Sequence, residues 1–261
     1  MKLSFAYFLV LGLLTTNSAS RQSRIIGGRE ANAGQFPYIA AIHVTTDTSK
    51  FFCGGALHGN EWIITAAQCV DQAISFTIQL ASINLNGDDE NKLILSSSTY
   101  VIHPDYNPNT LDSDIGLIKL RLPIEFTDYI IPIYNVPVAN TPPNWTVLSI
   151  GWGQIADNDP ELVENLRWVG LTSITNDECK ITYGSQISDN MLCAAGNYNE
   201  GTCVGDTGSP LVYLLKFGHA QLVGVASFVS GNGCETVDPS GYTRVFPFSD
   251  WITNITGVPP K

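Results

Sequence analysis

The stretch Ile64-Thr65-Ala66-Ala67-Gln68-Cys69 (ITAAQC) ends an apolar run and places an amide side chain directly before a cysteine. The run itself, EWIITAA, is rich in the β-branched and aromatic residues that favour strands. The Gln68 amide donates and accepts hydrogen bonds, but it does not take up a proton near neutral pH as an imidazole does. The stretch therefore predicts a strand that ends beside a polar group unable to act as a base.

Similar apolar segments recur at short intervals along the chain. They read FPYIAAIHV, SFTIQLAS, TYVIHP, IGLIKL, TVLSIGWG, LRWVGLTSI, SPLVYLL, QLVGVASFV and YTRVF. Turn-rich pieces such as NLNGDDEN and ADNDPE separate them, which is typical of an all-β protein of many short strands. The Pro-rich piece from Ile131 to Pro143 divides the strands into two similar groups, and the final FSDWITNI predicts one short helix.

Composition and charge narrow the classes of function. The chain has 261 residues, of which 44% are hydrophobic and only 14% are charged, so it can bury a large core. Its formal net charge is −11, and removal of residues 1–24 takes away three basic residues and no acid, which leaves −14. Such a surface repels phosphate backbones, and no basic run offsets it. Nucleic acid is therefore not an expected partner.

The amino-terminal residues have the pattern of a secretory signal. Met1-Lys2 precede an apolar run from Phe5 to Leu14 and the small, polar stretch TTNSAS, which ends at Ser20. The run is too short to span a bilayer, so residues 1–20 are predicted to be a signal peptide, and the alternative is a buried amino-terminal helix. Because no later segment has the apolar length to cross a membrane, we expect a secreted, extracellular protein.

Export determines how the cysteines are interpreted. Six cysteines without the CxxC pairing of a zinc site predict disulfides in an oxidising compartment, and no metal or other cofactor. Spacing alone does not choose the pairing. Asn144-Trp145-Thr146 and Asn254-Ile255-Thr256 are glycosylation sequons, which agrees with secretion.

Four motifs occur in one order: Arg24 followed by Ile25-Ile26-Gly27-Gly28, then TAAQC, then Asp112–Leu117 (DSDIGL), then Gly205–Pro210 (GDTGSP). In this order and spacing they resemble the chymotrypsin-like serine proteases (peptidase S1), and the resemblance covers Ile25 to the carboxyl end. It implies two six-stranded antiparallel β-barrels, at about residues 25–134 and 135–261, with the site in the cleft between them. The disulfides that it implies are Cys53–Cys69, Cys179–Cys193 and Cys203–Cys234.

The same resemblance implies a substituted catalytic triad. The family's mechanism needs a hydroxyl nucleophile, an imidazole base and a buried carboxylate. Asp114 matches the carboxylate, but Gln68 stands where the motif has His and Thr207 where it has Ser. We expect the Gln68 amide to donate to Asp114 in place of the imidazole. The histidines, expected away from the cleft, are His43, His58, His103 and His219.

Other parts of the family's apparatus are present in the sequence. Gly205 and Thr207 match the backbone donors of an oxyanion hole. Arg24 matches the activation cleavage site, with residues 21–24 as a short propeptide and a new Ile25 ammonium that pairs with Asp206. The alternative is that these residues merely persist from an active ancestor.

The specificity pocket is also implied by matching positions. Gly201 lies six residues before Thr207, where a trypsin carries Asp, so binding of a basic side chain is disfavoured. Val229 replaces a glycine of the pocket wall, and Ser240 lies at its base. By resemblance to elastases, the pocket is expected to be narrow and to suit a small apolar side chain. Ser227 matches a residue that hydrogen-bonds the triad carboxylate.

Three functions remain open from the sequence. The leading prediction is a secreted serine protease homologue, a monomer without peptidase activity, that binds a peptide, a protease inhibitor or an active protease. The second is a weak endopeptidase of elastase-like preference that uses Thr207 as its nucleophile. The third is a relic without a selected function.

Overall fold

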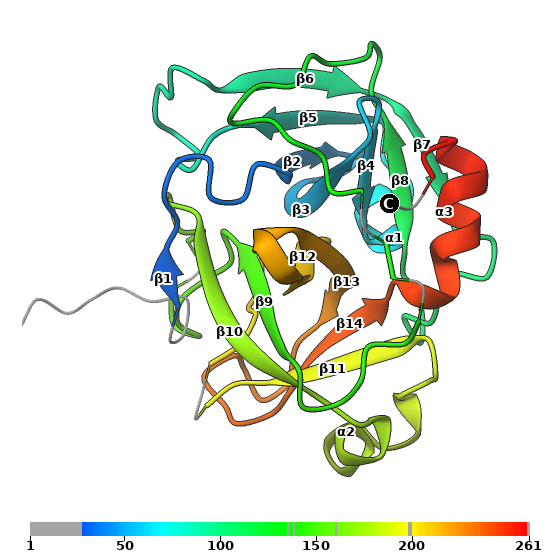
Figure 1. Ribbon diagram of the computed structural model, residues 1–261. Coiled ribbons are helices and arrows are strands. Elements are labelled where there is room, and N and C mark those ends of the chain that lie inside the picture. The colour runs from blue at the N-terminus through cyan, green and yellow to red at the C-terminus, as the bar shows by residue number, and fades with distance from the viewer. Residues whose placement is uncertain (1–27, 135, 138, 160, 198–199, 260–261) are drawn as a thin grey trace, which may run out of the picture.

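The computed structural model describes residues 28–259 except 135, 138, 160, 198 and 199. Two curved antiparallel sheets are stacked one above the other (Figure 1). The short helix α1 (Ala67–Val70) and strand β12 (Pro210–Leu214), which belongs to the second sheet, lie near the level where the two sheets meet. The predicted all-β fold is confirmed. The predicted signal peptide, propeptide, Arg24 and Ile25 lie outside the described residues.

The second sheet is a closed six-stranded barrel, as predicted. Strand pairings run around it and return from β9 to β10. Its strands, in spatial order, are β10 (Arg167–Ile174), β11 (Met191–Ala195), β14 (Ser240–Arg244), β13 (Ala220–Phe228), β12 and β9 (Thr146–Gly151). The short strand β1 (Arg29–Glu30) pairs with β10, although the sequence places it in the first group of strands.

The first sheet is curled, and hydrogen bonds do not close it among the described residues. Its strands, in spatial order, are β6 (Leu93–Ser97), β5 (Ser75–Leu80), β2 (Ile39–Thr45), β3 (Lys50–His58), β4 (Trp62–Thr65), β8 (Gly116–Lys119) and β7 (Thr99–Ile102). Only Ser98 separates β6 from β7, so one bent strand supplies both edges of the sheet. Of the two six-stranded antiparallel barrels that were predicted, the second is a closed barrel and the first is a curled half-barrel.

The reason for the incomplete closure lies beyond the last pair of β7 and β8, which is Thr99 opposite Lys119. Beyond this pair, β6 is paired with β5, while the segment after β8 bonds to the turn between β3 and β4, through Leu120 N–H to the Glu61 carbonyl and Ile124 N–H to the Asn60 carbonyl. Pro123, between these two residues, has no N–H to donate. The two segments therefore separate instead of continuing their pairing.

In the part of the chain that the structure describes, three helices complete the fold, together with single 3-10 turns at Gly184–Gln186, Lys216–Gly218 and Phe246–Phe248. The predicted carboxyl-terminal helix is α3 (Ser249–Thr256), which crosses back to the first half of the molecule (Figure 1) and buries Ile252 in the core. Helix α2 (Asn176–Tyr183) was not predicted. None of the helices in the described residues is long and apolar enough to span a membrane.

All three disulfides implied by the resemblance are present, namely Cys53–Cys69, Cys179–Cys193 and Cys203–Cys234. The first joins β3 to α1 across a sequence separation of 16 residues, a loop whose closure contributes about 3 kcal/mol on chain-entropy grounds. It therefore fixes α1, and with it Gln68, against the first sheet.

The two sheets meet most closely where β3 approaches the turn before β12. Gly54 N–H donates to the Thr207 carbonyl oxygen at 2.8 Å. A Cβ atom at position 54 would overlap the side chain of Ser209, so the backbone can approach this turn only with glycine at position 54. This contact positions the candidate nucleophile relative to the first sheet.

Gly54→Ala is therefore expected to destabilise the protein by about 2 kcal/mol, because the added methyl overpacks a buried junction. Ser209→Gly in the same chain should recover part of that loss, since it removes the Ser209 side chain while the Cα of residue 209 stays 2.8 Å from the added Cβ. Gly231→Ala is the matched control, since a Cβ at position 231 would meet no atom within 4 Å. Urea unfolding followed by tryptophan fluorescence measures all four proteins. Equal stabilities of the Gly54→Ala protein and the double variant would contradict this explanation.

Candidate active site

Three residues far apart in the sequence meet where the two halves face each other. Gln68 lies on α1, Asp114 precedes β8, and Ser227 lies on β13 of the closed barrel. Gln68 Nε2 lies 2.6 Å from Asp114 Oδ2 and 2.9 Å from the Ser227 carbonyl oxygen. The expected hydrogen bond from Gln68 to Asp114 is confirmed. Because both neighbours are acceptors, the amide nitrogen must face them, which fixes the orientation of the amide.

The Asp114 carboxylate is fully buried and surrounded by donors. Its Oδ1 accepts from the Gln68 backbone N–H at 2.9 Å, and its Oδ2 also accepts from the Ser227 hydroxyl at 2.6 Å. Burial raises the pKa of Asp114, and hydrogen bonds from Ser227 and Gln68 oppose that shift. The role expected of Ser227, a hydrogen bond to this carboxylate, is confirmed.

Thr207 is half-buried in the turn before β12. Within the described residues its hydroxyl has no hydrogen-bond partner, and its backbone carbonyl bonds to Gly54. The next residue, Gly208, has φ of 82°, and a Cβ there would overlap Thr65 and the Gly54 carbonyl. Glycine is therefore required at position 208 for the turn to present Thr207.

The four histidines all lie in the described part of the chain and make their contacts elsewhere. The His43 ring packs against Phe52, and His58 Nδ1 is 2.8 Å from the Ile133 carbonyl oxygen. The His103 ring packs between Phe248 and Trp251, and the His219 carbonyl accepts from Leu215 N–H. None of these interactions brings an imidazole to Thr207.

The backbone N–H groups of Gly205 and Thr207 donate no hydrogen bond within the described residues. Gly205 has φ of 97°, where a side chain would overlap Leu162. The neighbouring Asp206 N–H and Gly208 N–H are bonded to Cys203 and Ala226. Two uncommitted donors in one turn can bind an oxyanion or a carbonyl oxygen.

A small cavity of about 130 Å³ adjoins this turn. Its lining includes Val229, as expected, together with Thr202, Cys203, Val204, Asp206, Thr207, Ala226, Ser227 and Phe228. Gly201 and Ser240 are not part of that lining; they lie against each other, with Ser240 Oγ accepting from Thr202 N–H at 3.1 Å. Val204 and Phe228 were not predicted, although each is next in sequence to a predicted site residue. The cavity has room for a small side chain.

A second hollow, of about 440 Å³, lies on the other side of Gln68. Its lining is polar and was not predicted from the sequence: Thr46, Asp47, Thr48, Ser49, Phe51, Gln68, Asp71, Gln72 and Tyr106. The site therefore continues on both sides of the Gln68–Thr207 region, which is the shape needed to hold an extended chain.

Asp206 is buried, and Arg24 and Ile25, its predicted partners in activation, lie outside the described residues. Its carboxylate accepts from Gly153 N–H at 2.8 Å and Cys203 N–H at 3.0 Å. Burial raises the pKa of Asp206 to about 6, and these two backbone hydrogen bonds oppose the shift. No ion pair to Asp206 is present within the described residues.

Both sequons expose their asparagine side chains. Asn144 lies in a turn with φ of 64°, and Asn254 lies on the outer face of α3. One group of potential metal ligands occurs in the described residues, namely Asp157, Cys203 and Cys234, but the two cysteines form a disulfide. Their thiolates are therefore not available as ligands.

The chain is similar to known proteins over almost its entire length. Residues 25–252 match the trypsin family model. Brachyurin from Leptuca pugilator is 33% identical over 236 residues, which are 90% of this chain and 100% of that protein. Collagenase from Hypoderma lineatum is 35% identical over 271 residues, 98% of this chain and 99% of that protein. The solved structure of HL collagenase matches with a TM-score of 0.79 and 36% identity, covering 89% of this chain and 99% of that one.

Gln68→Leu is expected to lower the free energy of unfolding by about 2 kcal/mol, because it removes a donor from a buried carboxylate at almost constant volume. Gln186→Leu, at an exposed position without a side-chain hydrogen bond among the described residues, is the control. Chemical denaturation compares the variants with the unmodified chain. If Gln68→Leu is as stable as the control, the amide does not support Asp114.

The buried carboxyl of Asp206 predicts a pH dependence of stability for the chain that is not cleaved after Arg24. Its pKa of about 6 in the folded chain exceeds the usual value of 3.8, so the folded state holds a proton more tightly than the unfolded state. The free energy of unfolding should therefore fall as pH rises from about 4 to 6, by about 3 kcal/mol from this group.

Asp206→Asn should remove this part of the pH dependence, while Asp250→Asn at an exposed position on α3 should leave it in place. Denaturant titrations at a series of pH values test both. Parallel pH curves for the Asp206→Asn protein and the unmodified chain would refute the prediction.

Proposed function

Because the chain belongs to the trypsin family of serine proteases, we propose that it is a secreted member without peptidase activity, which acts by binding a peptide, a protease inhibitor or an active protease. The observation that supports the proposal is the Gln68 amide nitrogen, which donates to Asp114 and to the Ser227 carbonyl. In the catalytic triad of this family, the position of Gln68 is that of the histidine, whose imidazole acts as the base. Gln68 and Thr207 thus make a substituted triad with Asp114.

The chemical consequence follows from the proton of the Thr207 hydroxyl. Attack on a peptide carbonyl requires a group that removes this proton, and an amide nitrogen committed to two acceptors has no lone pair to offer. In subtilisin, loss of the Ser or the His of the triad lowers turnover by about 2 × 10⁶, or roughly 8–9 kcal/mol of barrier. A residual acceleration of about 10³–10⁴ over water remains from binding and the oxyanion hole.

Parts of the site that serve binding do not depend on the missing base. The free N–H groups of Gly205 and Thr207 suit a carbonyl oxygen of a bound chain. The 130 Å³ cavity beside Val229 suits one small apolar side chain, and the polar hollow beside Gln68 extends the site. A polypeptide in extended form is the ligand that fits this combination.

Secretion is part of the same proposal. Three disulfides are typical of an oxidising, extracytoplasmic compartment, and none of the cysteines in the described residues is free. The exposed side chains of Asn144 and Asn254 are accessible for glycan attachment. No metal or cofactor has a role in the proposed function.

A weak endopeptidase is the second candidate, and one observation favours it. Thr207 keeps a half-buried hydroxyl without a partner among the described residues, beside two free backbone donors. With water as the proton acceptor, slow cleavage after a small apolar residue would follow. Compared with serine, however, Thr207 has an extra methyl group, which restricts the side-chain torsion and disfavours attack of its hydroxyl on a peptide carbonyl.

The restoring double variant Gln68→His, Thr207→Ser tests the proposal. We expect it to cleave short peptides with Ala or Val before the scissile bond and to react with a fluorophosphonate probe, after cleavage at Arg24. The chain without these substitutions should do neither, yet should bind a protein inhibitor whose reactive loop presents a small apolar residue. Binding is measured by surface plasmon resonance.

Thr207→Ala in the otherwise unmodified chain is the control. Peptide turnover and probe labelling by the unmodified chain that disappear in Thr207→Ala would establish the endopeptidase and overturn the inactive assignment. If the chain neither turns over peptide nor binds such an inhibitor, the proposed binding role of the cleft is wrong.

A further inference from the structure

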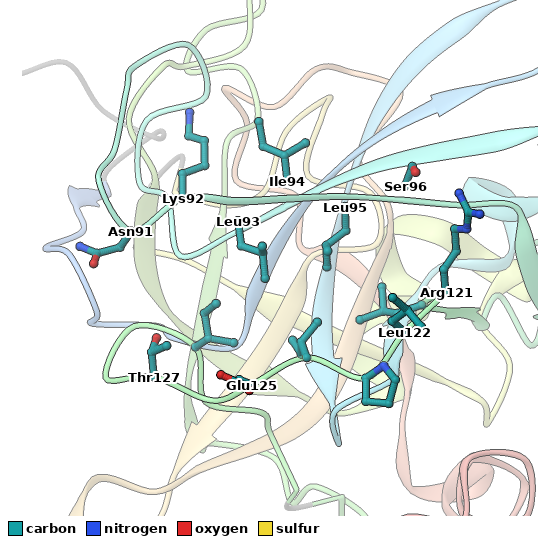
Figure 2. Close-up of a pocket in the computed structure, with 14 residues that line it drawn as sticks. Asn91, Lys92, Leu93, Ile94, Leu95, Ser96, Arg121, Leu122, Glu125 and Thr127 are labelled. Carbon is teal, nitrogen blue, oxygen red and sulfur yellow. The ribbon is translucent and has the colours of Figure 1, made fainter.

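A cavity outside the candidate active site lies on the open side of the first sheet. It has a volume of about 820 Å³ and is bounded by residues 91–96 on one side and by residues 120–130 on the other. Figure 2 shows Leu93 and Leu95 extending from β6 toward the chain segment that carries Leu122 and Glu125. We call this cavity the β6 groove.

The β6 groove is the place where the pairing of β7 with β8 is not continued. Thr99 lies opposite Lys119, and the same register extended along the chain would place Leu95 opposite Pro123. The two segments instead separate just beyond the hydrogen bond from the Ser97 hydroxyl to the Lys119 carbonyl. Two antiparallel segments thus flank a space into which a further strand fits.

One wall of the groove is a free strand edge. β6 pairs with β5, and within the described residues its other edge makes no ladder with any strand. Alternate residues of β6 therefore direct their backbone N–H and C=O groups into the groove. Five residues at roughly 3.4 Å each give an edge about 17 Å long, enough to pair with a peptide of similar length.

The other wall supplies apolar contacts. Ile124 and Ile130 belong to the core of the first half, and they line the groove because no strand covers them there. Leu122 is 75% exposed. Across the groove, Leu93 and Leu95 are half-buried against the same core. Side chains at alternate positions of an inserted strand would meet these aliphatic groups.

Charge distinguishes among possible occupants. Lys92 and Arg121 line the groove against the single acid Glu125, whereas the whole chain has 13 basic and 24 acidic residues. Figure 2 shows Lys92 and Arg121 at opposite ends of the groove, with the Lys92 side chain directed away from the segment that carries Leu122. The Lys92 ammonium donates to the carbonyls of Leu85 and Gly87 and interacts with Asp89, so Arg121 is the cation directed at an occupant. The lining thus has one more basic than acidic residue, on a chain of net charge −11. This difference favours an acidic ligand and disfavours a second copy of the chain, since the two net charges repel.

We propose that the β6 groove binds an extended segment of another protein, which adds a strand to β6. The segment has aliphatic residues at alternate positions, which pack on Leu95, Leu122 and Ile124, and an acidic residue at the end next to Arg121. This surface is separate from the cleft at Gln68, so it serves either function considered above.

A fluorescein-labelled synthetic peptide, Glu-Val-Thr-Val-Thr-Val-Glu, is the probe, and fluorescence anisotropy with the full disulfide-bonded protein is the measurement. Saturable binding below about 1 mM is expected, and Leu122→Glu should weaken it by about tenfold or more by removing apolar contact. Ile181→Glu, at an exposed position on α2, is the matched control and should change nothing. Both substituted side chains are at the surface, so both variants should fold.

Charge reversal tests the acidic end next to Arg121. Arg121→Glu should weaken the probe several-fold and strengthen a peptide with Lys at both ends, whereas Lys180→Glu on α2 should alter neither. Replacing the central Val of the probe by Pro should abolish binding, because Pro cannot donate to β6.

Four results would overturn the proposal. The first is that the probe does not bind at about 1 mM, and the second is that the Pro peptide binds as well as the probe. The third is that decanoate displaces the probe while Arg121→Glu leaves the affinity for both peptides unchanged. The fourth is that sedimentation equilibrium shows a dimer, which Leu122→Glu dissociates. The last two would identify an aliphatic amphiphile or a second copy as the occupant. None of these measurements depends on peptidase activity, so they are independent of the proposed function of the cleft.

Discussion

The buried carboxylate of Asp114 is the constraint on which the arrangement of the site depends. It is removed from water, and burial raises its pKa, so the folded state is stable only if donors surround it. Gln68 supplies two donors from the first half, and the Ser227 hydroxyl supplies a third from the closed barrel. The Thr243 hydroxyl adds a bond to the Asp114 carbonyl at 2.7 Å, again from the barrel. One acidic residue thus ties the two halves together.

This constraint explains how an amide fits the site without loss of structure. The carboxylate requires a hydrogen-bond donor at the position of Gln68, and an amide satisfies that need as well as an imidazole. Catalysis makes a further demand, a lone pair directed at the nucleophile, which the folded state does not need. The fold therefore needs only a donor at position 68, whereas catalysis also needs a base there. A family member can keep its fold and its binding surfaces while the base is absent.

Much of the fold could be predicted from the sequence because its strands are apolar and β-branched, and because the family motifs imply the disulfides. Strand β3 was missed because Gly54 and Gly55 interrupt its pattern; both positions need glycine for close packing against Ser209 and Ile63. Helix α2 carries a recognisable signal, the capping box of Thr175 and Glu178, which could have revealed it.

The site was predicted in its polar contacts but not in its shape. The hydrogen bonds of Gln68 and Ser227 to Asp114 follow from matched positions, whereas the lining of the small cavity depends on how neighbouring side chains pack. Gly201 and Ser240 show the limit, since matching implies that both belong to the pocket, whereas the lining of the small cavity includes neither, and the two lie close to each other. The pairing of β1 with β10 could not be predicted either, because β1 consists of only two exposed residues, which show no periodic pattern of apolar side chains.

The incomplete closure of the first sheet has a physical consequence of its own. A closed barrel has no free edge, whereas a curled sheet leaves one strand with unpaired backbone groups and part of its core accessible. Here the segment after β8 bonds to Asn60 and Glu61 on the opposite side, so its backbone does not continue the ladder that would seal the gap. An exposed edge invites indiscriminate pairing unless charge restricts it. Arg121 at one end of the β6 groove, on a chain of net charge −11, provides such a restriction, because it favours strands with an acidic residue at that end.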